Sequence, residues 1–162
     1  MPEAPKSQES PPSVAGTPRP WRWGGRRVEV HDESMRPTLQ PGDRLRVDVR
    51  AYRSQPPSVG DLVVFVDPEE PRRWIVKRVA AVGPGTWWRT AQGLVAGRSD
   101  APPTERPSDG VEMIRLGPST MWLLGDEPDR SRDSRRFGPV PRSALVGRAF
   151  RIYAPTARRR EL

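Results

Sequence analysis

The 162-residue sequence contains no cysteine and only one histidine, His31. Without a thiol the chain cannot form a disulfide, bind a metal through thiolates or use a cysteine nucleophile. A single imidazole does not build a usual zinc site. The sequence therefore predicts neither a metal nor any other cofactor.

Lysine is also scarce, with two lysines against 26 arginines in a chain of net charge +8. One of the two, Lys77, lies inside the apolar segment 74–82. An arginine is effectively never deprotonated, whereas a buried lysine can lose its proton and act as a base. The lysine is either a base of this kind or an incidental survivor of an arginine-rich composition.

Long apolar runs are missing as well. The longest run, residues 62–66, is far shorter than the roughly 20 residues of a membrane helix, and the N-terminus lacks a signal-peptide apolar region. These absences predict a cytoplasmic protein without a spanning segment. Trp21 and Trp23, interspersed with arginines, either pack on the edge of the domain or make a peripheral contact with lipid headgroups.

What the sequence does contain is a series of short apolar segments separated by glycine and proline turns. Six prolines and few bulky apolar residues predict a disordered leader over residues 1–20. The pattern then predicts one all-β domain over 21–154 and a basic tail over 155–162, with a hint of helix only at 143–146. The expected strands cover residues 28–30, 44–49, 62–66, 74–82, 121–124 and 145–153, with hairpins between 87 and 116.

Ser34 begins a turn that runs through Pro37 to Gly42 and Asp43. Proline biases the preceding residue away from helix, so this serine is expected on rigid, non-helical backbone. A serine hydroxyl needs a base to become a nucleophile. Lys77 can serve if desolvation lowers its pKa by about 3 units, while His31, three residues before the serine, is the alternative partner.

Several motifs follow one another in an order that resembles the signal peptidase I family of serine/lysine endopeptidases. The resemblance covers roughly residues 28–153. It is carried by Ser34-Met35-x-Pro37-Thr38-Leu39 with Gly42-Asp43, by Gly60-Asp61-Leu62-Val63-Val64-Phe65, by Lys77-Arg78-Val79, by Gly125-Asp126 with Ser131-x-Asp133-Ser134-Arg135, and by Phe137-Gly138-x-Val140-Pro141 with Val146-Gly147-Arg148-Ala149.

The resemblance implies a fold of two antiparallel β-sheets and a role for each matching residue. Ser34 would be the nucleophile, its N–H an oxyanion donor, Lys77 the general base, and Ser131 the group that orients the lysine. An ion-pair group of Arg78, Asp133 and Arg135 would shape the site. Val30, Met35, Leu39 and Val76 would line shallow pockets for small residues in an Ala-x-Ala pattern. The substrate would be a precursor protein with an N-terminal leader, bound as an added strand.

The residues before the nucleophile depart from the family pattern. The family has small residues there, whereas this chain has Asp32 and Glu33. No side-chain hydroxyl is available at Asp32 to donate to an oxyanion. Two carboxylates facing a developing negative charge would be unfavourable.

Three interpretations follow. The chain is a signal peptidase with at most peripheral membrane contact, or it removes the leader of a cytosolic precursor, as do the anchorless relatives that mature nickel-type superoxide dismutase. The interpretation from another class is a non-catalytic β domain that binds protein or nucleic acid. Because the basic residues are scattered among acids and no glycine-rich phosphate loop precedes a helix, we expect no nucleic-acid partner.

Overall fold

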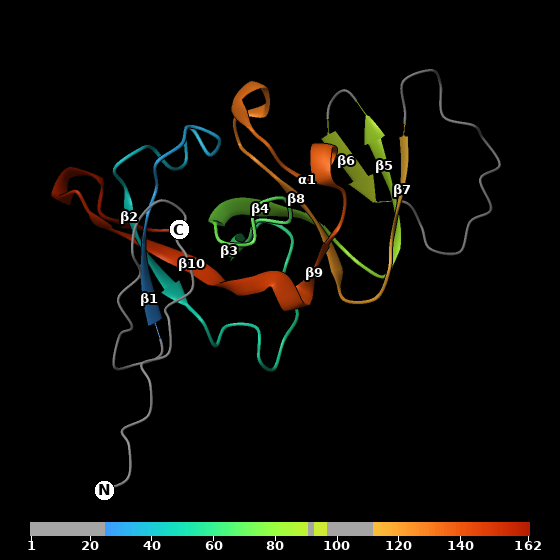
Figure 1. The fold of residues 1–162 in the computed structure, drawn as a ribbon, viewed down its shortest axis with the longest axis horizontal. Helices are drawn as coiled ribbons and strands as arrows, with labels where there is room; N and C mark the ends of the chain where they lie inside the picture. Colours follow the sequence, from blue (N-terminus) through green and yellow to red (C-terminus); the bar gives the residue numbers. More distant parts are fainter. Residues whose placement is uncertain (1–24, 91–92, 97–111) are drawn as a thin grey trace, which may run out of the picture.

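The computed structural model describes residues 25–90, 93–96 and 112–162. The predicted leader over 1–20 and the two tryptophans Trp21 and Trp23 lie outside the described residues. Within these ranges the chain forms two antiparallel sheets, one of eight strands and one of three (Figure 1). This confirms the predicted all-β fold.

The larger sheet has the order β1-β2-β10-β3-β4-β8-β9, and β11 pairs with β10. Its strands are β1 (Gly25–Glu29), β2 (Arg44–Asp48), β3 (Leu62–Val66), β4 (Trp74–Val82), β8 (Thr120–Leu124), β9 (Val140–Pro141), β10 (Leu145–Ala154) and β11 (Arg160–Glu161). The apolar run of β3 pairs with β10 at one edge and with β4 at the other, and side chains on both of its faces are buried in apolar clusters.

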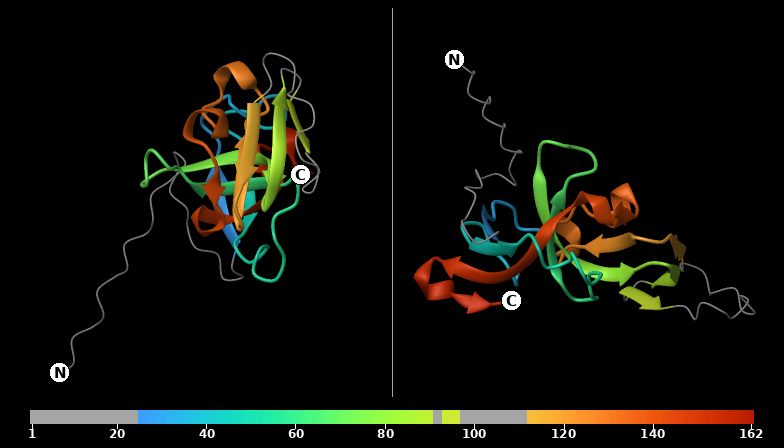
Figure 2. Two further views of the ribbon diagram at one scale, coloured as in Figure 1. Left: turned by 90° about the vertical axis from the view of Figure 1, so that its right-hand side faces the viewer. Right: turned by 90° about the horizontal axis from the view of Figure 1, so that it is seen from below.

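The smaller sheet is formed by β5 (Gly85–Thr90), β6 (Gly93–Ala96) and β7 (Glu112–Leu116), in the order β6-β5-β7. It lies at one end of the molecule, as the right-hand view in Figure 2 also shows. Ile114 and Leu116 of β7 pack with Ala81 of β4 and Trp122 of β8. This cluster attaches the small sheet to the large one.

Two further apolar clusters flank the larger sheet. Val64 and Val76 belong to the cluster that also contains Met35 and Leu39. Val63 and Ile75 belong to the other. Because successive residues of a strand face opposite sides, β3 and β4 supply both clusters. The turn of residues 32–39, which carries the proposed nucleophile Ser34 and is called the nucleophile turn below, packs against one of them through Met35 and Leu39.

The helical elements differ from the sequence expectation. The hint of helix at 143–146 is confirmed only in part, since the 3-10 helix η2 (Arg142–Ala144) covers its first residues and β10 begins at Leu145. The charged loop after β8 instead contains a 3-10 turn η1 (Pro128–Arg130) and a single helical turn α1 (Ser134–Phe137). Asp133 caps this turn by accepting from the N–H of Arg135.

The C-terminal segment 155–162 forms a 3-10 turn η3 (Thr156–Arg158) and strand β11. Leu162 packs against the apolar cluster that contains Met35. In the ranges that the structure describes, no helix has both the length and the apolar character to cross a membrane.

Candidate active site

Ser34 lies on the turn between β1 and β2, and this turn is held by its own backbone. The N–H of Arg36 donates to the carbonyl of Glu33 at 3.1 Å, and that of Leu39 to the carbonyl of Met35 at 2.8 Å. The carbonyl of Ser34 accepts from Glu127 N–H of the loop after β8 at 3.0 Å. The serine is therefore presented on fixed, non-helical backbone and is buried, with 3% of its surface exposed.

Lys77 of β4 lies beside this serine, 43 positions away in the sequence. Its Nζ donates to Ser34 Oγ at 2.5 Å and to the carbonyl of Val76 at 3.1 Å. His31, the alternative partner for Ser34, is exposed, and its Nε2 lies 4.0 Å from Oε1 of Glu29. The structure thus brings together the serine and the lysine that the sequence singled out.

The surroundings of Lys77 favour the neutral amine. Burial lowers the pKa of Lys77 below its ordinary value, because an ammonium group loses its hydration there. The carboxylates of Asp32 and Asp133 oppose this shift, while the positive charges of Arg73 and Arg132 add to it. The direction is the one that a lysine base requires.

Asp32 is the residue whose contact the sequence reasoning missed. Its Oδ1 accepts from Ser34 Oγ at 2.6 Å and from the N–H of Ser34 at 3.0 Å. Burial raises the pKa of Asp32, but the hydrogen bonds from Ser34 and the charge of Lys77 outweigh it, so that its pKa lies below the ordinary value. The sequence contained one indication of this contact, because Asp32 stands at a position before Ser34 where the family has a small residue.

Ser131 lies in the loop after η1 and belongs to a hydrogen-bonded group around Asp133. Its Oγ donates to Asp133 Oδ2 at 2.6 Å, and the same carboxylate accepts from Gly125 N–H and from Arg135. No hydrogen bond joins Ser131 to Lys77 within the described part of the chain. Burial raises the pKa of Asp133, but the Arg135 hydrogen bond and those from Gly125 and Ser131 keep it below its ordinary value.

Arg78 does not join this group, because it pairs with another carboxylate of the same loop, Asp126, and not with Asp133 as expected. Its guanidinium pairs with both carboxylate oxygens of Asp126, at 2.8 and 2.7 Å, and reaches Thr38 and the carbonyl of Gly60. The pair therefore connects β4 and the loop after β8 to the nucleophile turn. The sequence showed the Gly125-Asp126 motif but did not indicate that Arg78 pairs with Asp126.

The four expected pocket residues lie together in one apolar cluster with almost no exposed surface. Met35 and Leu39 are 0% exposed, Val30 1% and Val76 4%. These side chains form part of the core that supports Ser34. With so little exposed surface, they do not line an open pocket in this structure, so their expected role in substrate binding stays a prediction.

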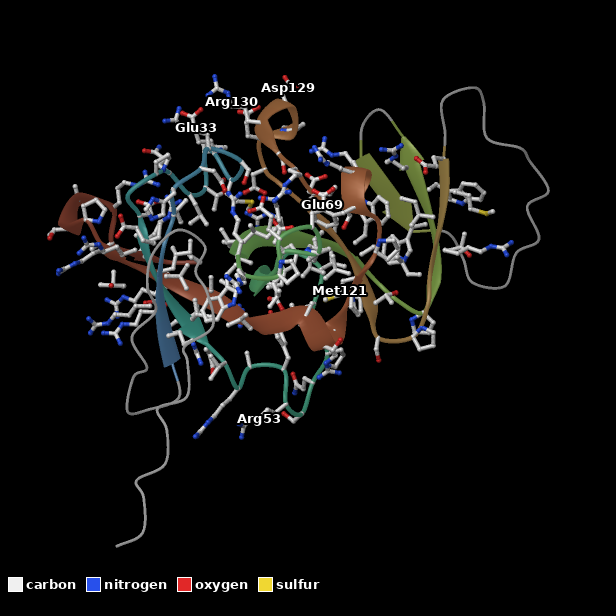
Figure 3. All side chains as sticks on the ribbon, in the orientation of Figure 1. Glu33, Arg53, Glu69, Met121, Asp129 and Arg130 are labelled. Atoms are coloured by element: carbon white, nitrogen blue, oxygen red, sulfur yellow. The ribbon has the colours of Figure 1, made fainter. Side chains whose placement is uncertain are left out.

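Ion pairs connect the loops around the serine. Glu33 pairs with Arg130 of η1, and both are labelled at the top of the molecule in Figure 3. Arg132 pairs with Asp67 and, at 2.7 Å, with Glu69 of the turn between β3 and β4. The nucleophile turn, the β3–β4 turn and the loop after β8 thus meet around one serine. A buried serine–lysine pair of this kind can carry out nucleophilic acyl transfer without a metal.

Comparisons with known proteins identify the family of the chain. A family model described as "Signal peptidase, peptidase S26" matches residues 25–154. A probable signal peptidase I-1 of Synechocystis sp. is 31% identical over 141 residues, with 80% of this chain and 71% of the relative covered. A mitochondrial ATP-independent inner membrane protease subunit 1a of Arabidopsis thaliana is 30% identical over 130 residues, with 79% of this chain and 70% of the relative covered. A crystal structure of a signal peptidase I from Enterococcus faecalis aligns with a TM-score of 0.45 and 20% identity, over 58% of this chain and 97% of that chain.

Proposed function

Because the chain belongs to the signal peptidase family, peptidase S26, and is a signal peptidase I-type protease, we propose that Ser34 is its nucleophile and Lys77 its general base. The observation that carries this proposal is the 2.5 Å contact between Lys77 Nζ and Ser34 Oγ. Burial of the lysine supports the proton transfer, because it stabilises the neutral amine relative to the ammonium.

The proposed reaction proceeds in two steps. Ser34 Oγ attacks the carbonyl carbon of the scissile peptide while its proton passes to Lys77 Nζ, and the N–H of Ser34 binds the resulting oxyanion. The C–N bond then breaks, and the lysine gives the proton to the leaving amine. Water attacks the acyl-enzyme with the lysine again as base, which releases the carboxylate product and restores the serine.

The substrate is proposed to be a precursor protein whose leader ends in small residues. This preference rests on the family resemblance of Val30, Met35, Leu39 and Val76, which belong to one buried apolar cluster. Among the described residues, β8 pairs with β4 from Arg78 onward, so the edge of the first half of β4 that faces away from β3 would be the place for an added substrate strand. The names of the two relatives, a signal peptidase and an inner membrane protease, support a leader-removing role.

Ser131 is proposed to orient the amine of Lys77. Its donation to Asp133 leaves the lone pairs of its hydroxyl free to accept from the Lys77 amine during the reaction.

Membrane contact through Trp21 and Trp23, beside several arginines, also stays a proposal from composition. Vesicle flotation that is unchanged by Trp21→Ala with Trp23→Ala would refute it.

Cleavage of a peptide with an Ala-x-Ala sequence tests the mechanism. Ser34→Ala, Lys77→Ala and Lys77→Arg should each abolish turnover, since a guanidinium does not give up its proton at working pH. Ser131→Ala should lower kcat by about 10²-fold, on the scale of positioning effects. Ser58→Ala, an exposed serine between β2 and β3, and Lys6→Arg are the matched controls and should keep wild-type activity. An active Lys77→Arg enzyme would exclude the lysine base.

A further inference from the structure

The carboxylate of Asp32 occupies both groups of Ser34 that the proposed mechanism needs. Its Oδ1 accepts from the hydroxyl at 2.6 Å and from the amide N–H at 3.0 Å. The hydroxyl is the nucleophile, and the amide is the proposed donor to the oxyanion. One oxygen atom of Asp32 therefore lies where the carbonyl oxygen of a substrate has to bind.

The donors and acceptors available to these groups fix the direction of each bond. An ionised carboxylate only accepts, so the single proton of the Ser34 hydroxyl is donated to Asp32. Lys77 then contacts the same hydroxyl oxygen as a donor, at 2.5 Å. During attack, however, the serine proton has to reach the lone pair of Lys77. The arrangement in the structure is thus a resting one.

We propose that Asp32 is an inhibitory carboxylate, which holds the Ser34 hydroxyl and amide in the resting arrangement and has to turn away before a substrate can react. This inference rests on the proposed Ser34–Lys77 mechanism. Arg73 of the β3–β4 turn lies 3.8 Å from the other oxygen, Oδ2, and offers a partner on the outer side. The side chain of Asp32 is 38% exposed, so it has room to rotate.

The charges around Lys77 make the effect dependent on pH. The carboxylates of Asp32 and Asp133 are the largest charges that favour the ammonium form of Lys77, and the carboxylate of Asp126 also interacts with it. Arg73 and Arg132 disfavour it. Neutralising Asp32 removes one of these stabilising charges, so Lys77 should lose its proton at lower pH.

The first test is the pH profile of kcat/KM for Asp32→Asn, a neutral side chain of the same shape. The rising limb should move to lower pH by about 1–3 units, the range for the loss of a nearby opposite charge. Activity below both midpoints should rise about tenfold for each pH unit by which the midpoint moves. Glu33→Gln is the matched control, because Glu33 carries the same charge one position away and pairs with Arg36 and Arg130. It should keep the wild-type midpoint.

A second measurement observes the lysine without catalysis. The chain has only two lysines, so ¹³Cε-lysine labelling gives two NMR signals, and Lys6→Arg assigns them. The titration of Lys77 should move to lower pH in Asp32→Asn and in Asp32→Ser, but not in Glu33→Gln.

Two results would overturn the role of Asp32. One is an unchanged pH midpoint with an unchanged Lys77 titration in Asp32→Asn, and the other is loss of activity in Asp32→Asn at every pH. Neither result touches the proposed function, which fails if Ser34→Ala, Lys77→Ala or Lys77→Arg retains turnover. The two proposals are therefore tested separately.

Discussion

At the scale of single residues, Lys77 is in an environment that is costly for stability. The side chain is 2% exposed, and its surroundings oppose the charged form. In the unfolded chain the amine is fully hydrated and protonated up to its ordinary pKa of about 10.4. The folded protein therefore carries a penalty at this position, which a residue kept for packing alone would not impose.

Lys77→Met should stabilise the fold near neutral pH, by about 1–4 kcal/mol, as replacements of buried charges by apolar residues often do. The pKa of Lys77 is lower in the folded than in the unfolded state, so the unfolded chain binds more protons between the two pKa values. The destabilisation that Lys77 causes is therefore complete at pH values below its folded pKa. It decreases as the pH rises toward the unfolded pKa. Urea unfolding at pH 6 and pH 10 should show the gain of Lys77→Met shrinking at the higher pH.

Arg53→Met is the matched control, because Arg53 is an exposed cation of the β2–β3 connection. Its effect should stay within about 0.5 kcal/mol and should not change between pH 6 and 10, since arginine remains protonated. A destabilised Lys77→Met protein would mean that the lysine holds the fold together.

The sequence identifies some residues of the site but not all of their contacts. Ser34 and Lys77 were identifiable because each lies in a local pattern, a proline-restricted turn and an apolar strand. The partner of Arg78 was not identifiable from the sequence, because Asp126 and Asp133 lie in the same loop. Only the folded path of that loop decides between them. The contact of Asp32 with Ser34 likewise depends on a side-chain rotamer, which no residue pattern encodes.

At the scale of elements, the end of β8 approaches the nucleophile turn at Gly125. A Cβ atom placed there would lie 2.1 Å from Ser131 Oγ and 2.6 Å from the backbone oxygen of Ser34. The amide of Gly125 also donates to Asp133 Oδ2 at 2.9 Å. Glycine at this position lets the loop after β8 and the nucleophile turn share one narrow space.

Gly125→Ala should therefore disturb the site more than the fold. The added methyl group has to displace the backbone of Ser34, and a displacement of that kind costs about 10²-fold in kcat and about 1–3 kcal/mol of stability. Gly117→Ala, in the turn between β7 and β8, is the control, because its added Cβ meets nothing within 4 Å. Peptide turnover and urea unfolding measure both variants, and equal turnover in the two would contradict the close approach.

Elements with strong patterns were predicted from the sequence and weakly patterned ones were not. The bounds of β3 and β4 follow from an unbroken apolar run and from the glycine and proline that end the strands. The single turn α1 has no helical periodicity and exists because Asp133 caps it. The two-residue strands β9 and β11 are too short to show alternation and depend on their neighbours.

At the scale of the whole molecule, the last residues of the chain hold the turn that carries the nucleophile. Arg158 of η3 donates to both oxygens of Asp43, at 2.6 and 2.9 Å. Asp43 is 1% exposed and also accepts from the N–H of Gln40 at 2.8 Å. The guanidinium reaches the carbonyl of Thr38, four residues after Ser34, as well. The C-terminal segment thus supports the far side of the nucleophile turn.

Arg158→Ala should leave the buried carboxylate of Asp43 without its counter-ion. Breaking a fully buried pair costs about 3–5 kcal/mol, and we expect about 2–3 kcal/mol here because 26% of the Arg158 side chain is exposed. Arg159→Ala is the control, since Arg159 is exposed, donates to the backbone carbonyl of Tyr153 and should cost under about 0.5 kcal/mol. Urea unfolding separates the two variants. If Arg158→Ala also lowers kcat while Arg159→Ala does not, the support extends to the nucleophile, and equal stability of both variants would show that Asp43 does not need its partner.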